Sequence, residues 1–413
     1  MPVQPQNNQE TIMQRYRGTG DSSRQDPDPS GPVYEPDVLI VGDQSIQAVQ
    51  EALKAVGIEA TVDEKAPPMG PFKLLRLTPE GDTSPEDLVE DAMKVLVGES
   101  KPRASSSEEE PLIVQPNYIH GAPQMRGGVY AVPDPVTMPD LDIVPSAIGA
   151  GIKVLVLDTA YNASPKVDPV FPPPVPSVPP PEDPPLSGDL APAAGHCTFV
   201  IGQILRVAPG ATIMTPRVVL DGNGIGTDTT LLTQLHQIMI SGEIPHLVNL
   251  SLGYYTLFDE PPLAIGYALE TLQNEGVVIV AAAGNEDDDR PWYPAADTDR
   301  TVSVGAVVRV NNQWARAAYS NYGTWVDFVA RGLNEGPYLE WTQQPQPYGG
   351  WARWGGTSFS TPLVVGQLAA LMAAGGISAV DAVTLLQSLS ATAPADFPGA
   401  KVVAPTLLWG QSD

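Results

Sequence analysis

The segment VVIVAAAGN, residues 277–285, decides the fold class of this 413-residue chain. Its apolar run ends at a Gly-Asn pair, as expected of a strand that is buried on both faces and turns at the edge of a sheet. KVLVLD (153–158) and LVNLS (247–251) have the same character, and runs with helical spacing separate them. This alternation predicts an α/β fold, a doubly wound, mostly parallel sheet whose active groups gather at the carboxyl ends of the strands.

Residues 147–413 are expected to form this large domain. Strands are predicted at 154–157, 211–219, 247–251, 277–282, 301–307 and 325–329, and helices at 199–206, 229–241, 262–275 and 360–374. A proline-rich segment, 163–187, interrupts the alternation and is predicted to be an exposed loop, because it has no residues for a packed core. A ligand for a proline-recognition module is the alternative for this loop.

The first third of the chain has a different organisation. Residues 1–35 are polar and without periodicity, which predicts a disordered lead. A small α+β domain of order β-α-β-β-α-β is predicted for 36–121, and a Pro- and Gly-rich linker for 122–146. Its strands are expected at 38–41, 58–62, 73–77 and 112–114, and its helices at 45–56 and 84–97, the second capped by Ser84.

Charge and cysteine content exclude several classes of function. The net charge of −26 leaves no basic stripe for nucleic acid and opposes binding to anionic membranes. The single cysteine, Cys197, cannot form an intramolecular disulfide. Because the first twenty residues also lack the apolar run of a signal peptide, a cytoplasmic location is expected, with secretion by another route left open.

Four polar residues stand at the edges of predicted buried elements. Asp158 ends KVLVLD, His196 opens an apolar helical run, Asn285 follows VVIVAAAG, and Ser358 lies in GGTSFSTP at the start of a helix. Taken singly, each has an ordinary explanation as a turn residue, a structural histidine or a helix cap. Taken in order, they supply an orienting carboxylate, a general base, an oxyanion donor and a nucleophile. The remaining histidines, His120, His236 and His246, are assigned to the linker and to structural positions.

Five blocks carry a resemblance to a known family. DTA (158–160), GHCTFVIG (195–202), NLSLG (249–253), AAAGNE (281–286) and GTSFSTP (356–362) resemble, in order, the signature blocks of the subtilisin-like serine proteases. The resemblance covers about residues 150–375. It implies a serine endopeptidase acting on peptide or protein substrates through an acyl-enzyme, and requiring no cofactor.

The resemblance also implies a role for each matching residue. Ser358 would attack the scissile carbonyl, His196 would transfer the proton, and Asp158 would hold the imidazole. The Asn285 amide and the Ser358 backbone N–H would form the oxyanion hole. The substrate backbone would pair with one segment as an added strand, and a second segment would line a roomy, apolar specificity pocket: Ser251, Leu252 and Gly253 in the first, and Ala282, Ala283 and Gly284 in the second.

The N-terminal domain resembles the inhibitory propeptide of the same family and ends in IVQPNYIHGA (113–122). The resemblance implies a precursor inhibited by its own N-terminal domain and cleaved at some point between Tyr118 and Ser146. A separate regulatory or docking domain is the alternative.

The chain departs from the family pattern at a few positions. Cys197 follows the histidine where glycine is usual, Ala160 replaces a glycine, and ARG (330–332) replaces Ala-Pro-Gly. Cys197 is either a packed thiol or a point where a bulky reagent would block activity by crowding His196. The acidic cluster 286–289 is either a solvated loop or, as in many family members, a possible calcium site.

The sequence allows three other functions to different degrees. A peptide-binding protein with the same fold but weak or no catalysis stays open, although no catalytic residue is missing. A carboxyl-type relative using Ser with Glu and Asp is disfavoured by His196 and Asn285. An α/β-hydrolase esterase is disfavoured because Ser358 is not in a G-x-S-x-G elbow.

Overall fold

A computed structural model describes residues 31–79, 88–97, 112–121, 133–138, 147–161, 190–214, 217–342 and 347–405. The chain forms two compact units. Unit 1 contains residues 1–119, 227–240 and 254–268, and unit 2 contains the remainder. Residues 1–30 of the expected lead, Ser84, most of the expected linker and the proline-rich loop lie outside the described residues.

Unit 1 has the predicted small α+β domain, with element order β-α-β-β-α-β. Its antiparallel strands are arranged in the order β2-β3-β1-β4, and β1 pairs with both β3 and β4. The elements are β1 (Tyr34–Gly42), η1 (Asp43–Ser45), α2 (Ile46–Lys54), β2 (Ile58–Val62), β3 (Phe72–Pro79), α3 (Leu88–Val97) and β4 (Val114–Gly121). The strand β1 therefore begins inside the expected disordered lead.

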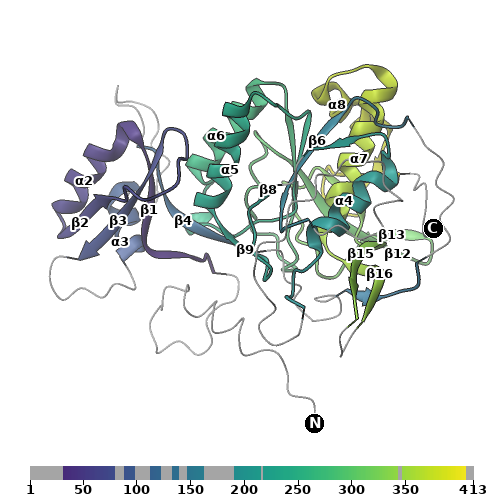
Figure 1. The fold of residues 1–413 in the computed structure, drawn as a ribbon, viewed down its shortest axis with the longest axis horizontal. Coiled ribbons are helices and arrows are strands. Elements are labelled where there is room, and N and C mark those ends of the chain that lie inside the picture. The colour runs from purple at the N-terminus through teal and green to yellow at the C-terminus, as the bar shows by residue number, and fades with distance from the viewer. Residues whose placement is uncertain are drawn as a thin grey trace, which may run out of the picture. The chain divides into compact units, whose positions relative to one another are not determined.

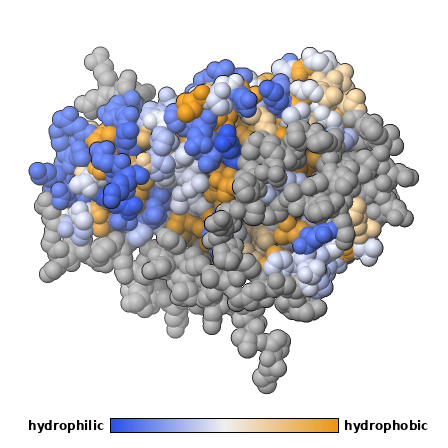
Figure 2. Space-filling view, in the orientation of Figure 1, coloured by the Kyte–Doolittle hydropathy of each residue, from blue (hydrophilic) through white to orange (hydrophobic). Residues whose placement is uncertain are grey.

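The two helices of this domain are amphipathic. Val49 and Leu53 are the buried residues of α2, and α3 buries Leu88, Ala92 and Leu96. Their other faces are polar, and the visible surface over α2, β2 and α3 is mostly hydrophilic (Figure 2). The domain thus has a small core of its own, as the spacing of its apolar residues predicts.

The last strand of unit 1 differs from the prediction. A strand was expected at 112–114, whereas β4 runs from Val114 to Gly121 and includes His120, which was assigned to the linker. The strand is hard to predict because Pro116 within the run counts against a strand. Its polar side chains, which suggest an exposed linker, are in fact buried: Gln115, Asn117 and His120. Gln115 and Asn117 are buried with hydrogen-bond partners from helices far away in the sequence.

Unit 2 contains the predicted parallel sheet, with strand order β17-β18-β14-β12-β11-β10-β6-β7. All neighbours from β18 to β7 are parallel, and only β13 and β17 pair antiparallel. The strands are β6 (Lys153–Asp158), β7 (Thr212–Ile213), β8 (Arg217–Val218), β10 (Leu247–Leu250), β11 (Val278–Ala282), β12 (Val302–Val310), β13 (Gln313–Arg316), β14 (Phe328–Arg331), β17 (Ala391–Thr392) and β18 (Lys401–Val403). The strand expected at 211–219 is two short strands, β7 and β8.

Helices α4 (His196–Val207) and α7 (Thr357–Gly375) cover this sheet, and they pack against each other (Figure 1). α7 contacts β10, β11, β12 and β14. By length and composition alone α7 could cross a membrane, but 67% of its apolar stretch is buried inside the protein, as in a core helix. The other helices are α5 (Asp228–Ser241), η3 (Leu257–Asp259), α6 (Leu263–Asn274) and α8 (Ala379–Leu389). The short strand β9 (Ile225–Thr227) directly precedes α5.

An antiparallel hairpin in unit 2 was missed by the sequence prediction. β15 (Leu333–Trp341) pairs with β16 (Tyr348–Gly355), and β16 pairs with β5 (Asp134–Pro135), which lies in the expected linker. The glycines and charged residues of the hairpin mask its strand pattern. It packs on α4 where Gly202 leaves room, since a β-carbon there would come within 2.8 Å of Pro337 Cγ. The hairpin places Trp354 of β16 against His196 of α4.

Candidate active site

Asp158 and His196 meet at the carboxyl end of β6. Asp158 is the last residue of β6, and His196 is the first residue of α4 after Gly195, which has φ 75°. The His196 Nδ1 atom lies 2.7 Å from Asp158 Oδ1, and both side chains are buried. The same carboxylate oxygen accepts a 2.7 Å hydrogen bond from the Thr159 N–H. The carboxylate is therefore held in place from two sides.

Aromatic side chains fix the imidazole ring. Trp354 of β16 meets the His196 ring edge-on, with centroids 5.6 Å apart at 87°, and Phe359 of α7 lies at 5.2 Å. Trp354 and Phe359 also contact each other and Phe199. Since aromatic neighbours exclude water, they strengthen the electrostatic interaction between Asp158 and His196.

Ser358 lies in the first turn of α7, two residues after Gly356, which has φ 148°. The helix was expected to begin at Ser360, but it begins at Thr357 and contains Pro362. Pro362 has no N–H to donate to the Ser358 carbonyl one turn earlier. The Ser251 hydroxyl donates to that carbonyl instead, at 2.8 Å. Ser251 therefore replaces the hydrogen bond that the proline removes.

Asn285 is oriented by Thr357. Its side-chain oxygen accepts hydrogen bonds from the Thr357 N–H (2.9 Å) and the Thr357 hydroxyl (3.0 Å). Because the oxygen accepts these two hydrogen bonds, the other amide atom, Nδ2, is the one that can donate. This nitrogen lies close to Gly356, since a β-carbon on Gly356 would be 3.4 Å from it. Thr357 was not singled out from the sequence, because a threonine in a first helical turn is also an ordinary capping residue.

The structure brings Asp158 and His196 into direct contact, and it links Ser358 to them indirectly through its neighbour Phe359. The Ser358 hydroxyl is directed at the Ser251 carbonyl oxygen, 3.4 Å away. Among the described residues, no hydrogen bond joins His196 to Ser358. Hydrogen bonds of this kind are often long without substrate and tighten when it binds, so the separation fits a resting site.

The segment Ser251–Gly253 follows β10 and pairs with another strand. The Gly121 N–H donates to the Gly253 carbonyl at 3.2 Å, in an isolated antiparallel bridge. Leu252 is fully buried, so this segment offers its backbone and not the Leu252 side chain. An antiparallel bridge is the contact expected where an extended peptide is added to an edge strand.

The segment that was expected to line a roomy specificity pocket is closely packed in the structure. Ala282, Ala283 and Gly284 are small, as predicted, but the Trp292 indole packs against Gly284 and Gly253. A β-carbon on Gly284 would lie 2.9 Å from Trp292 Cδ2, and one on Gly253 would lie 2.7 Å from Trp292 Cδ1. The small residues Gly253 and Gly284 thus leave room for a tryptophan of the same chain. Residue type alone could not reveal this, since the tryptophan comes from a later loop.

The departures from the family pattern are accommodated. The Cys197 side chain is fully buried and its N–H donates to the Thr159 hydroxyl at 3.1 Å. Burial, and then the Asp158 charge, raises the pKa of the Cys197 thiol well above its usual value. Ala160 is not among the described non-glycine residues with positive φ, so alanine fits there without strain. The Arg331 carbonyl, in the replaced ARG segment, accepts a 3.1 Å hydrogen bond from Ser360.

The acidic cluster at 286–289 does not fit a calcium site. The Asp287 carboxylate pairs with Arg316 at 2.5 Å, and Asp288 Oδ1 accepts the Arg290 N–H at 3.1 Å. Nowhere in the described part of the chain do three or more His, Cys, Asp or Glu side chains gather in a way that could hold a metal. Two of the four carboxylates of this cluster, those of Asp287 and Asp288, are thus used in an ion pair and a turn.

Comparison with known proteins places this geometry in a family. Residues 188–400 match the model of the subtilase family. Subtilisin Savinase of Lederbergia lenta is 32% identical over 234 residues, which are 54% of this chain and 76% of that protein. Fervidolysin of Fervidobacterium pennivorans, a keratinolytic enzyme related to subtilisin, has the same fold. Its TM-score is 0.55 at 18% identity, covering 92% of this chain and 61% of fervidolysin.

A further relative corrects the expected location. An extracellular serine proteinase of Thermus sp. (strain Rt41A) is 34% identical over 142 residues, which are 33% of this chain and 32% of that protein. The prediction of a cytoplasmic location is therefore wrong. It rested on one cysteine and a polar start, and a fold that needs no disulfide does not fix its compartment. By its family match and its relatives, this chain belongs to the subtilase family of serine proteases.

Proposed function

We propose that this chain is a serine endopeptidase that uses Ser358 as nucleophile, His196 as general base and Asp158 as the orienting carboxylate. The observation that carries the proposal is the 2.7 Å contact of His196 Nδ1 with the buried Asp158. A proton on Nδ1 that is held by Asp158 leaves the opposite nitrogen, Nε2, as the base. No side chain other than these is needed to move the proton.

The reaction proceeds in two halves. The Ser358 oxygen attacks the scissile carbonyl while His196 Nε2 takes its proton, and His196 then gives that proton to the leaving amine. Water repeats the sequence on the acyl-enzyme. The developing oxyanion accepts hydrogen bonds from the Asn285 amide and from the Ser358 N–H, which has no partner within its helix in this first turn. The positive end of the α7 dipole favours the same charge.

We propose further that the N-terminal domain is an intramolecular inhibitor. Two kinds of contact support this, one in each unit. In unit 2, Gly121 pairs with Gly253, the segment proposed to bind the substrate backbone. In unit 1, Gln115 and Asn117 of β4 accept hydrogen bonds from the first turns of two helices, at Ala264 N–H (2.6 Å) and Thr229 N–H (3.0 Å). The end of β4 would lie along the cleft like a bound product.

The experiment is self-processing of the purified full-length protein. Wild type is expected to react with a fluorophosphonate probe and to acquire a new N-terminus after Gly121 and before Ser146, as read by N-terminal sequencing. Ser358→Ala is expected to lose both, with turnover lower by about a million-fold. Ser388→Ala serves as the matched control, because Ser388 is an exposed serine on α8.

Each result has a defined meaning. Labelling or processing that persists in Ser358→Ala would contradict the assigned nucleophile. Folded wild type that neither labels nor processes would favour a peptide-binding protein with this fold. Labelling without processing would retain the peptidase and reject the self-inhibited precursor.

A further inference from the structure

Two neighbouring strand ends border the space beside the nucleophile. Leu250 of β10 pairs with Ala281 of β11, so the segments that follow these strands lie side by side. The first segment contacts Ser358 through Ser251, and the second contacts Thr357 through the Gly284 N–H at 3.1 Å. A substrate paired with the first segment would place the side chain that precedes its scissile bond between the two. That space decides which residues the enzyme accepts there.

The Trp292 indole occupies this space. A β-carbon on Gly253 would overlap Trp292 Nε1, and a β-carbon on Gly284 would lie 2.9 Å from Cδ2 and 3.0 Å from Cγ. The two glycines belong to opposite walls, and the ring contacts both. Trp292 is only 6% exposed, so the indole is enclosed by protein. A large substrate side chain could enter only if the indole left.

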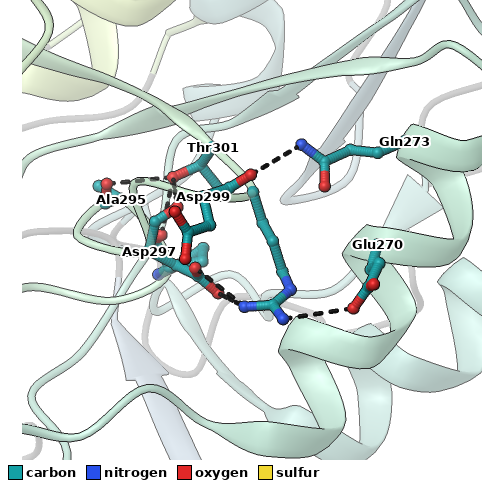
Figure 3. Close-up of polar contacts among 8 residues, drawn as sticks. Glu270, Gln273, Ala295, Asp297, Asp299 and Thr301 are labelled. Atoms are coloured by element: carbon teal, nitrogen blue, oxygen red, sulfur yellow. Dashed lines mark hydrogen bonds and ion pairs between the residues drawn. The ribbon is translucent and has the colours of Figure 1, made fainter.

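The loop that carries Trp292 is held by polar contacts, which Figure 3 shows. The Ala296 N–H donates to the Trp292 carbonyl at 2.8 Å. The Thr301 hydroxyl lies 2.9 Å from the Pro294 carbonyl oxygen and 3.1 Å from that of Asp297. The Thr301 hydroxyl is thus within hydrogen-bonding distance of these two carbonyl oxygens of the turn, which holds the backbone of the loop in one conformation.

An arginine ties the same loop to a helix. Arg300 pairs with Asp297 at 3.2 Å in the loop and with Glu270 of α6 at 3.2 Å. Gln273, one turn further along α6, donates to the Asp299 carbonyl at 3.3 Å (Figure 3). Because the loop is anchored at both its turn and its end, the Trp292 backbone has little freedom to withdraw the ring.

We propose that Trp292 is the specificity-determining residue of this enzyme and limits the residue before the scissile bond to Gly, Ala or Ser. The inference rests on the proposed function and names its substrate class. Trp292 acts by filling space, so it touches the substrate side chain and takes no part in proton transfer. Removing the indole opens a pocket walled by Gly253 and Gly284, which would then accept an aromatic side chain.

The test starts from the full-length protein and allows it to process itself. Two diphenyl phosphonate probes are then compared on the product. One probe has an alanine side chain and the other a phenylalanine side chain, and a fluorophosphonate without a side chain measures the competent enzyme. Wild type is expected to react with the alanine probe on the order of 100-fold faster than with the phenylalanine probe. Trp292→Ala is expected to abolish or reverse this ratio, with each rate expressed per amount of protein that the fluorophosphonate labels.

Two further variants make the test robust. Trp292→Leu retains an apolar side chain, guards against misfolding of the alanine variant, and is expected to give an intermediate ratio. Trp314→Ala is the matched control, because Trp314 lies on β13 with its ring under Arg309 and is a tryptophan outside the loop that carries Trp292. It is expected to keep the wild-type ratio.

The outcomes separate this inference from the function beneath it. A wild type that prefers the phenylalanine probe, or a ratio unchanged in Trp292→Ala and Trp292→Leu with fluorophosphonate labelling intact, would overturn the role of Trp292 and leave the peptidase standing. Loss of fluorophosphonate labelling from folded wild type would overturn the peptidase itself, and this inference with it.

Discussion

Three helices donate hydrogen bonds from backbone N–H groups of their first turns: α5 and α6 in unit 1 and α7 in unit 2. The same kind of donor has a different role in the two units. At α5 and α6, Thr229 N–H and Ala264 N–H donate to amide side chains of β4. At α7, Thr357 N–H donates to the Asn285 oxygen, and the N–H of the next residue, Ser358, is the proposed oxyanion donor. A helix N-terminus can therefore hold a segment of the chain or prepare an oxyanion site, depending on which donors are already satisfied.

The acceptors in all three places are neutral amides. A buried amide with hydrogen-bond partners costs less to desolvate than a buried carboxylate, because it carries no net charge. Gln115 uses both ends of its amide, since its Nε2 donates to the buried Asp228 carboxylate at 2.6 Å and its oxygen accepts from α6. Asn285 likewise has an oxygen that orients it and a nitrogen that can donate. The bifunctional amide is the common element of the two regions.

The largest effect is expected where the amide acts on the transition state. Asn285→Ala should lower kcat by about 10²–10³ with little change in KM, because the donor stabilises charge that develops only during the reaction. Steady-state kinetics on a peptide substrate measures this. Asn223→Ala, in a turn formed with Asp221, is the control and should be unchanged. An equal loss in both variants would refute the special role of Asn285.

At the other two helices the amide should affect stability instead. In the inactive Ser358→Ala background, Gln115→Ala should lower the free energy of unfolding by about 1–3 kcal/mol, because two buried groups lose a hydrogen-bond partner. Urea unfolding of the full-length chain measures it. Gln47→Ala is the matched control, since Gln47 is exposed on α2 and bonds only to Glu51. A comparable loss in Gln47→Ala would show that burial of the amide is not the cause.

A smaller effect is expected from the residue that orients Asn285. Thr357→Val removes the hydroxyl that donates to the Asn285 oxygen and accepts from Gly284 N–H. Of these two hydrogen bonds only the one to Asn285 orients the proposed oxyanion donor, and the loss of one neutral hydrogen bond corresponds to about 1 kcal/mol, or about fivefold in kcat. Thr357→Ser keeps the hydroxyl and should restore kcat, which separates positioning from packing. A Thr357→Ser variant as slow as Thr357→Val would show that the hydroxyl alone does not position Asn285.

The smallest effect concerns Cys197 in the first turn of α4. Burial raises its pKa, so its thiol stays protonated at a pH where an exposed cysteine already forms thiolate. A thiol reagent such as DTNB should react slowly at pH 8 in the folded protein and rapidly in urea. The folded-state rate should keep rising with pH beyond the ordinary thiol range near 8.5. Rapid modification of the folded protein at pH 8 would contradict this burial.

The sequence alone determined where the four candidate residues lie within their helices and strands. Asp158 and Asn285 end or follow apolar runs, and His196 and Ser358 open helices beside glycines, so periodicity and turn residues place all four at element ends. In a parallel sheet those ends share one edge, which is why the site could be anticipated. The α/β fold and the small N-terminal domain followed from the same local patterns.

Only the tertiary structure decided what surrounds that chemistry. The β15–β16 hairpin that brings Trp354 to His196, the Gln115 contact with Ala264 across 149 positions, and the Trp292 ring between two glycine walls have no local signature. Small residues in a wall indicate that something packs closely against them, but not whether it is a substrate or a side chain of the same chain. That distinction depends on packing between segments distant in sequence, which hydrophobic periodicity does not encode.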